Sequence, residues 1–373
     1  MSSFLKRKFI FLLFFLISVV FVFYSIKFKK STSVSSRLNR TVVVSYNDLN
    51  ESLLNSKLIQ IISLGVKEIY VRIESQIHIT CSFKVEDPCR VDKSQVNSVA
   101  AWQSFLKALG EKGITANLVY DLNINNFSYK MHSYKSERGR IEGPSSVGNL
   151  KSRFIFQNTK FIEIIKSDFN IISGLTDFKR VFFGSDLDLF FSQLPDITII
   201  QSEVQGFWKL IKQLKEINPN KSLSSCFNYE HLKGSLFWGA MDKTQMRKQD
   251  EFCFSSFPTQ IKWAKKFGIE KQFVLLDSPK DDFTSDYYDS LVTIGLTEKP
   301  IHIVGFAYPL LPEEKDLQAK VLNTVLYALP RYIASVAWEN RLSLNDQKNL
   351  AESMSIWHEQ DFNLNSSGSM FFE

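Results

Sequence analysis

Residues 177–242 read DFKRVFFGSDLDLFFSQLPDITIIQSEVQGFWKLIKQLKEINPNKSLSSCFNYEHLKGSLFWGAMD. Two apolar runs in this stretch, Val181–Phe183 and Ile197–Ile200, have the composition of buried strands. Acidic residues follow both: Asp186 and Asp188 after the first run, and Glu203 after the second. In α/β proteins ligands bind beyond the carboxyl ends of strands, so we expect the functional site of the protein in this stretch.

Strand-like and helix-like segments alternate along the rest of the chain. The predicted strands are Thr41–Tyr46, Glu68–Ile73, Ile114–Tyr120, Phe273–Leu276 and Pro300–Gly305. The predicted helices are Leu49–Leu64, Ser98–Leu109, Lys160–Phe169, Pro258–Phe267, Leu317–Leu329 and one or two helices in Trp338–Trp357. Gln76–Val96 is expected to be an irregular insertion, and Leu122–Ser152 a long loop. This alternation predicts βαβ units and a mainly parallel sheet.

An apolar segment near the N-terminus predicts a membrane anchor. Residues 9–28 are almost continuously apolar and approach the length that spans a bilayer, without an evident cleavage site. We therefore expect a cytoplasmic tail at 1–8, an uncleaved signal anchor at 9–28, a stem at 29–40 and one lumenal domain at 41–373. This layout is that of a single-pass type II protein of the Golgi or endoplasmic reticulum membrane.

The charge of the chain argues against a nucleic-acid partner. The formal net charge is +6 over 373 residues, but many of the basic residues flank the apolar N-terminal segment. The remainder is near neutral and carries no basic footprint for nucleic acid.

Cysteines and glycosylation patterns agree with a lumenal domain. The four cysteines are Cys81, Cys89, Cys226 and Cys253, an even number that is compatible with two disulfides. The sequence leaves their pairing open, although Cys81 and Cys89 could close a small loop, and their spacing fits no zinc site. Acceptor patterns for N-glycosylation occur at Asn39, Asn50, Asn126, Asn220 and Asn365.

Several successive stretches carry a resemblance to a known family. They are VVVSYND at 42–48, LGVKEIYVRIES at 64–75, the turn Leu109-Gly110 to Gly113-Ile114, RVFFGSDLDLFFSQL at 180–194, IIQSEV at 199–204 and CFNYEHLKGSLFWGAMD at 226–242. In these stretches the chain resembles the fungal capsule-associated α-1,3-mannosyltransferases, the cryptococcal mannosyltransferase family. In layout it is also similar to yeast type II proteins that are needed to add pyruvylated galactose to cell-wall galactomannan.

The resemblance implies a GT-A-like nucleotide-sugar transferase fold and a divalent cation, Mn or Mg, that neutralises the leaving diphosphate. Two metal sites stay open. In one, Asp186 and Asp188 form an Asp-x-Asp ligand pair at a strand end. In the other, these two residues begin a helix and Glu203 is the ligand.

The resemblance also implies roles for other residues. Asp242 takes the position of a family acid and is a candidate base, beside Glu203, and Tyr229 and Trp238 are candidates for substrate binding. Independently of the resemblance, Glu74 and Asp121 follow predicted strands, where they could contact the ribose or base of a nucleotide.

Three functions compete. The first is a cell-wall glycosyltransferase that uses a nucleotide sugar and a glycan acceptor, alongside other Golgi transferases. The second is a (β/α)8 glycosidase, because up to eight strand-like runs can be counted; Asp188 or Glu203 would then pair with Asp277. The third is a non-catalytic partner that keeps a transferase-like fold.

Overall fold

The computed structural model describes residues 38–45, 58–80, 89–93, 99–124, 155–184, 191, 197–228, 243–256, 299–306 and 333–339. Apart from Leu38 they belong to one compact unit, Asn39–Glu373. Its strands are β1 Asn39–Ser45, β2 Glu68–Thr80, β3 Arg90–Lys93, β4 Thr115–Ile124, β5 Val181–Phe183, β6 Leu223–Asn228, β7 Phe252–Ser256, β8 Ile301–Phe306 and β9 Ile333–Glu339. Its helices are α3 Val99–Glu111, η2 Ile155–Gln157, α6 Thr159–Ser173, α8 Ile197–Ile217 and α10 Lys243–Arg247.

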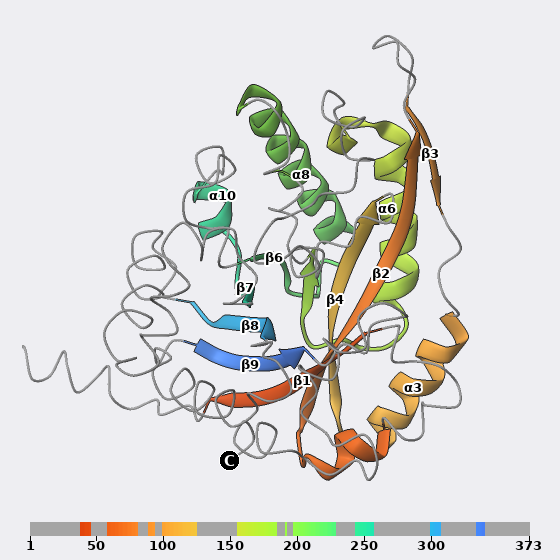
Figure 1. Cartoon of the computed structure of the whole chain (residues 1–373), viewed down its shortest axis with the longest axis vertical. Helices are drawn as coiled ribbons and strands as arrows, with labels where there is room; N and C mark the ends of the chain where they lie inside the picture. Colours follow the sequence, from red (N-terminus) through yellow and green to blue (C-terminus); the bar gives the residue numbers. More distant parts are fainter. Residues whose placement is uncertain are drawn as a thin grey trace, which may run out of the picture. The chain divides into compact units, whose positions relative to one another are not determined.

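Eight of these strands form a closed parallel barrel. Their order is β1-β9-β8-β7-β6-β5-β4-β2, and an additional parallel pairing between β1 and β2 closes the ring. Helices α3, α6 and α8 lie outside the strands (Figure 1). Because a closed ring has no edge strand, the backbone groups of every described barrel strand can pair on both sides.

Strand β2 continues beyond the barrel as one arm of a hairpin. Its C-terminal residues Ile77–Thr80 pair antiparallel with β3. Helix α6 holds this hairpin in place, because the buried carboxylate of Asp168 bonds Lys93 of β3 and accepts a hydrogen bond of 3.1 Å from Tyr120 of β4. The β2–β3 hairpin is therefore stabilised by its contact with α6 as well as by its own strand pairing.

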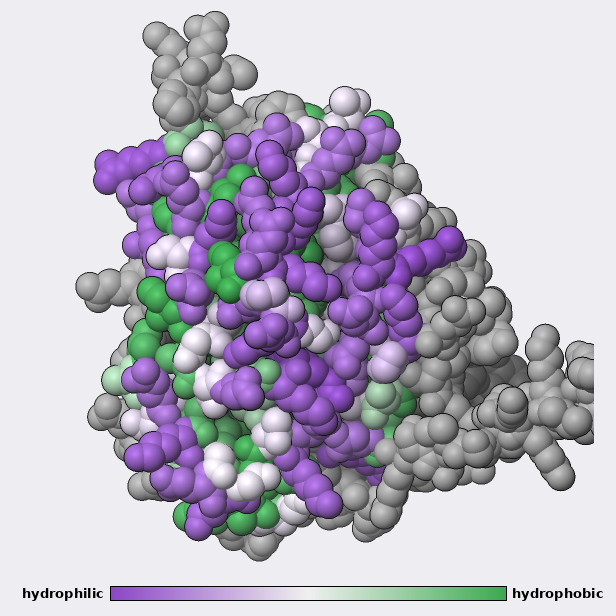
Figure 2. Space-filling model, turned by 180° about the vertical axis from the view of Figure 1, so that it is seen from behind, coloured by the Kyte–Doolittle hydropathy of each residue, from purple (hydrophilic) through white to green (hydrophobic). Residues whose placement is uncertain are grey.

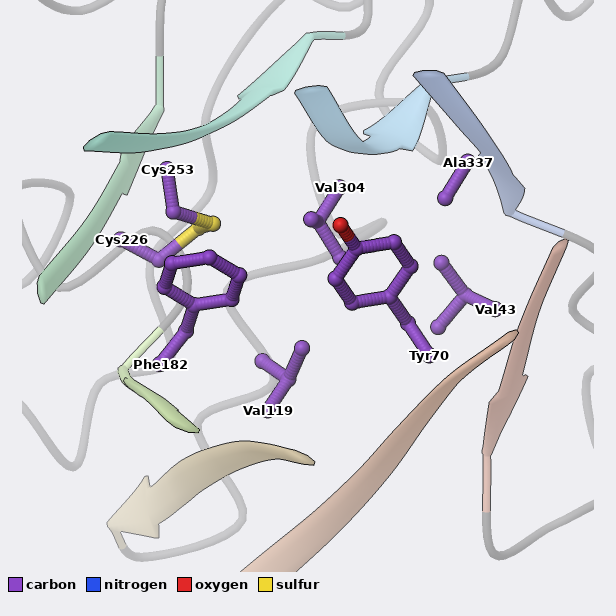
Figure 3. Packing of buried hydrophobic residues seen from close by; sticks show 8 residues of the cluster. All are labelled: Val43, Tyr70, Val119, Phe182, Cys226, Cys253, Val304 and Ala337. Carbon is purple, nitrogen blue, oxygen red and sulfur yellow. A yellow bond between two sulfur atoms is a disulfide. The ribbon is translucent and has the colours of Figure 1, made fainter. Parts of the chain in front are cut away.

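One side chain from each barrel strand packs in the centre of the barrel. The set is Val43, Tyr70, Val119, Phe182, Cys226, Cys253, Val304 and Ala337, and all eight are buried (Figure 3). Cys226 and Cys253 face each other across β6 and β7 and form a disulfide. The interior is thus a packed core and not a pore, as expected for a barrel of eight strands.

The described surface carries no large apolar cluster on the face that Figure 2 shows. Hydrophilic residues predominate there, with hydrophobic residues scattered between them (Figure 2). The large hydrophobic residues that are exposed in the described part are Ile59, Ile62, Ile171 and Ile197. Single exposed apolar residues of this kind are ordinary and need no partner.

Much of the predicted secondary structure is confirmed. Strand β5 has the predicted bounds, and α3, α6, β1, β4 and β8 lie where the strand and helix patterns predicted them. Helix α3 ends through Gly113, whose φ of 70° is a left-handed conformation that glycine adopts without strain. The predicted segments at 258–267, 273–276 and 317–329 lie outside the described residues.

Other predictions are wrong. Ile197–Ile200 is the first turn of α8 and not a strand: the buried residues Ile200, Val204, Phe207 and Leu214 recur at helical spacing. Gln76–Val96, which was predicted to be an irregular insertion, begins with the last five residues of β2 and also contains β3. Trp338 lies in β9 rather than at the start of a helix.

The predicted GT-A-like fold is also wrong. That prediction required an open sheet, whereas β1 pairs with β2 on one side and with β9 on the other. Strand–helix alternation is common to open and closed parallel sheets, so the pattern alone did not separate them. The closed barrel was the fold that the glycosidase alternative required.

The predicted membrane anchor lies in a part of the chain that the structure does not describe. Within the described ranges no helix is both long and apolar enough to cross a bilayer. Residues 9–28 themselves lie outside those ranges, as do the predicted tail and most of the stem.

Candidate functional site

Charged side chains close the N-terminal end of the barrel interior. Arg180, just before β5, places Nη1 3.1 Å from Oε2 of Glu68 and donates from Nε to Oε1 of Glu251 at 3.2 Å. Lys179 Nζ lies 3.1 Å from the same oxygen of Glu68, and the amide of Asn39 donates to Oε1. Burial by itself would raise the pKa of Glu68, but Arg180 and Lys179 outweigh it and lower that pKa. Polar groups at this end of a barrel serve stability.

Above these charges, three residues have the connectivity of a catalytic triad but not its chemistry. Ser335 Oγ lies 2.8 Å from Nδ1 of His302, and Nε2 of His302 lies 3.7 Å from Glu251. The hydroxyl of Tyr70 completes the cluster, 2.9 Å from Ser335. Burial, and then the charge of Arg180, lowers the pKa of His302 to about 3. A neutral, fully buried imidazole of this kind is a poor general base near neutral pH. The cluster is a buried polar core in which Nδ1 of His302 is bonded, while its Nε2 has no hydrogen-bond partner within the described residues.

A second polar cluster lies in the C-terminal half of the barrel. Tyr70 and Val119 point into the interior (Figure 3). Since side chains alternate along a strand, Arg72 and Glu74 of β2 and Asp121 of β4 point the same way. Glu74 and Asp121 are register partners on adjacent strands.

Burial distinguishes the members of this cluster. Arg72 is fully buried, and its Nε lies 3.8 Å from Oδ2 of Asp121, which is 1% exposed. Oδ1 of Asp121 accepts a hydrogen bond of 3.0 Å from the backbone N–H of Leu122. Glu74 is partly exposed. A buried ion pair therefore lies beneath a carboxylate that reaches solvent, at the end of the barrel where enzymes of this fold bind substrates.

Glu203 does not follow a strand, as the sequence predicted, but lies within a helix. It is on α8, fully buried, and its Oε2 accepts a hydrogen bond of 3.0 Å from the backbone N–H of Phe156 in η2. Its Oε1 has no hydrogen-bond partner within the described residues. Burial raises the pKa of Glu203 to about 7, although the backbone N–H groups of Phe156 and Ile155 act in the opposite direction. Its surroundings are those of a carboxyl group that joins two helical segments.

The structure places some of the other predicted residues. Cys226 pairs with Cys253, which settles one bridge, and Cys89 is also disulfide-bonded. Among the predicted glycosylation sites, Asn220 is exposed beyond the end of α8, whereas the side chain of Asn39 is bonded to Glu68. Several predicted residues lie outside the described ranges: Asp186, Asp188, Tyr229, Trp238, Asp242, Asp277, Cys81, Asn50, Asn126 and Asn365.

The described residues do not form the predicted metal site. No group of three or more His, Cys, Asp or Glu side chains within them could hold a metal ion. The one predicted ligand that can be placed, Glu203, is buried against backbone N–H groups, which are not metal ligands. A divalent cation therefore stays a prediction that rests on the sequence alone.

Comparisons with known proteins agree with the barrel. No family model and no curated protein matches the chain. Among solved structures, the GH113 β-mannanase of Alicyclobacillus acidocaldarius is 12% identical, with 90% of this chain and 95% of that chain covered and a TM-score of 0.51. The endo-1,4-β-mannanase of Rhizomucor miehei is 10% identical over 89% and 94% of the two chains, with a TM-score of 0.52. A β-D-glucuronidase of Dictyoglomus thermophilum matches with 9% identity over 89% of this chain and 49% of its own, at a TM-score of 0.52. At such low identity these likenesses define the fold.

The neighbours overturn the fold on which the predicted function depended. The predicted glycosyltransferase with a nucleotide-sugar partner required a GT-A-like open sheet, whereas the chain and these neighbours share a closed barrel, so that prediction is wrong.

Arg72 is the member of the polar cluster that sequence reasoning missed. A charged residue inside the apolar strand EIYVRI is a signal in itself, because a buried charge needs a partner. Its partner, Asp121, is 49 positions away in the printed sequence and is brought near only by the β2–β4 pairing.

Proposed function

We propose that the protein is a glycoside hydrolase of the (β/α)8 class, with its active site at the C-terminal end of the barrel. The observation that carries this proposal is the carboxylate pair Glu74 and Asp121, in register on adjacent barrel strands beside Arg72. Hydrolysis of a glycosidic bond requires two carboxyl groups, one as acid and one as nucleophile or base.

The geometry suggests a role for each group. Glu74 is the carboxyl group with access to solvent, so it would protonate the leaving oxygen of the substrate. Asp121 is buried beside a guanidinium that compensates its negative charge, so it would face the anomeric carbon as a carboxylate. Neighbouring strands are about 4.8 Å apart, which brings two in-register carboxyl groups near the separation of about 5 Å found in retaining enzymes.

Substrates with β-linked mannose are the first to test, because the neighbours with matching length are named as mannanases. The full chain would be incubated with mannohexaose and with β-1,4-mannan, and the products followed by chromatography. Proton NMR of the first product would report the anomeric configuration, for which we expect retention.

Variants test the assignment of the residues. Glu74→Gln and Asp121→Asn should each lower the hydrolysis rate about a hundredfold or more, because general acid–base or nucleophilic catalysis contributes at least that much. Glu111→Gln, an exposed change in α3, is the control and should leave the rate unchanged. Unaltered rates in both test variants would refute the assignment of the site. Absence of hydrolysis on any β-linked glycan would refute the proposed function, and retained glycan binding without hydrolysis would instead favour the non-catalytic partner.

A further inference from the structure

A cavity lies outside the barrel, along α8. Its volume is about 960 Å³, and α8, β6 and the α10 segment line it. We call it the α8 cavity. Ligand pockets of small organic molecules range from about 300 to 1,000 Å³, so the space suits a ligand of several rings better than a single ion.

The charge of the α8 cavity has one sign. Four lysines line it, and none of its described lining residues is acidic. Lys215 forms an ion pair with Asp250 at 3.2 Å. Lys209, Lys212 and Lys248 are exposed, and no ion pair joins them to any described residue. Ammonium groups that converge without acids favour a ligand with negative charges.

Two further donors remain without partners among the residues that line this cavity. The side chain of Gln249 is only 6% exposed, and its Oε1 accepts from Ser225, with the Oγ of Ser225 at 2.8 Å. Its Nε2 has no hydrogen-bond partner within the described residues. The same holds for Nε1 of Trp208. Buried N–H groups are normally bonded, so two orphan donors are unusual, but both atoms are enclosed and neither is open to the cavity.

The remaining lining points to a carbohydrate. The indole ring of Trp208 is held by edge contacts with Phe207 and Phe227, at 5.0 and 6.3 Å between ring centroids. An anchored aromatic ring offers a flat apolar face to the C–H face of a sugar. Gln201 and Gln205 add amide groups, which both donate and accept and therefore match hydroxyl groups.

We infer that the α8 cavity binds an acidic oligosaccharide, with Lys209, Lys212 and Lys248 on its anionic groups and Trp208 against a sugar ring. This site is distinct from the proposed active site inside the barrel, and it does not depend on hydrolysis. It would hold an acid-substituted glycan on the outer face of the barrel.

Calorimetry with the full chain tests this inference. The probes are tetragalacturonate, maltotetraose as a neutral α-linked oligosaccharide of the same length that is not a substrate of the proposed β-mannan site, and inorganic phosphate at equal ionic strength. Tetragalacturonate should bind, and maltotetraose should bind at least tenfold more weakly, because charge-assisted hydrogen bonds of 1.5 kcal/mol or more correspond to about that factor. Failure of tetragalacturonate to bind, or equal binding of inorganic phosphate or maltotetraose, would overturn the inference.

Paired variants locate the site. Lys209→Gln with Lys212→Gln should weaken tetragalacturonate binding by about tenfold or more. Lys107→Gln with Lys112→Gln, at and beyond α3, removes the same charge from another exposed surface and should leave the affinity unchanged. Trp208→Phe keeps an aromatic ring but loses the indole N–H, and should weaken binding less than Trp208→Leu. Melting temperatures of all variants would verify folding, and an equal loss in the α3 control pair would show a nonspecific charge effect and refute the site.

Discussion

At the residue scale, Glu203 shows how burial decides the role of an acid. In the sequence Glu203 follows an apolar run, and this position indicates a metal ligand or a catalytic group. In the structure it bonds the backbone of η2 from within α8. The carboxyl group of Glu203 therefore links α8 to η2, and burial raises its pKa.

We expect Glu203 to make stability depend on pH. Its pKa in the folded protein is about 7 against an ordinary value of 4.5, so folding favours the protonated form. Its stabilising contribution is complete below about pH 4.5 and is lost as the pH rises through 7, by roughly 3 kcal/mol in total.

Urea unfolding of wild type and Glu203→Gln between pH 4 and 8 measures this effect. The amide cannot ionise but can still accept from Phe156, so the variant should match wild type at pH 4.5 and exceed its stability at pH 8. Parallel pH curves for the two proteins would contradict the expected titration.

At the scale of elements, the contact between α8 and η2 depends on a glycine. A Cβ atom on Gly206 would lie 2.7 Å from the carbonyl oxygen of Phe156 and 2.9 Å from its Cβ. The backbone cannot yield as a flexible side chain would, so the two elements can pack this closely only with glycine at this position.

Gly206→Ala should therefore destabilise the protein by about 1–3 kcal/mol, the usual cost of overpacking. Gly110→Ala in α3 is the matched control, because its new methyl group would meet nothing within 4 Å. It should stabilise by about 0.5–1 kcal/mol through helix propensity. Thermal unfolding of both variants gives the comparison, and a neutral Gly206→Ala would mean that the two elements are not in close contact.

At the scale of the whole molecule, the barrel depends on charges that come from separate strands. Glu68 begins β2, Arg180 precedes β5 and Glu251 precedes β7, and they meet across the intervening strands β4 and β6. Their side chains are between 11% and 19% exposed, so they are shielded but still touch solvent. Removal of Arg180 would take the nearest cation from Glu251 and leave Glu68 with Lys179 as its remaining cationic partner.

Arg180→Met should cost about 2–4 kcal/mol of unfolding free energy near pH 7, somewhat below the full cost of breaking a buried pair. Because the pKa of Glu68 is lowered in the folded protein, its stabilising contribution exists above its ordinary value of 4.5 and is lost as the pH falls through the folded pKa. The cost of the variant should therefore shrink at acid pH.

Arg90→Met is the control for this variant. Its ion pair with Asp92 is exposed, at 80% and 49% for the two side chains, and such pairs contribute little. Chemical denaturation at pH 7 and pH 3 would test both variants. A cost for Arg180→Met that is independent of pH would indicate lost packing rather than lost charge.

The sequence by itself determined the local elements of this protein. Apolar runs such as Val181–Phe183 and the amphipathic pattern of α3 and α6 specify strands and helices because burial periodicity is a local property. It also marked Glu74 and Asp121 as acidic residues at the ends of predicted strands. It did not identify α8 at Ile197–Ile200, where β-branched residues begin a helix whose periodicity is visible only over a longer window.

Only the tertiary structure decided that the sheet closes and which acids share a site. The pairing of β1 with β2 and β9 joins segments from opposite ends of the chain, and an open parallel sheet would bury the same local pattern. In the closed barrel Arg72, Glu74 and Asp121 face the same interior, whereas Glu203 lies on helix α8 outside the barrel. The physical reason is that the free energy of these contacts comes from partners distant in sequence, about which a local pattern carries no information.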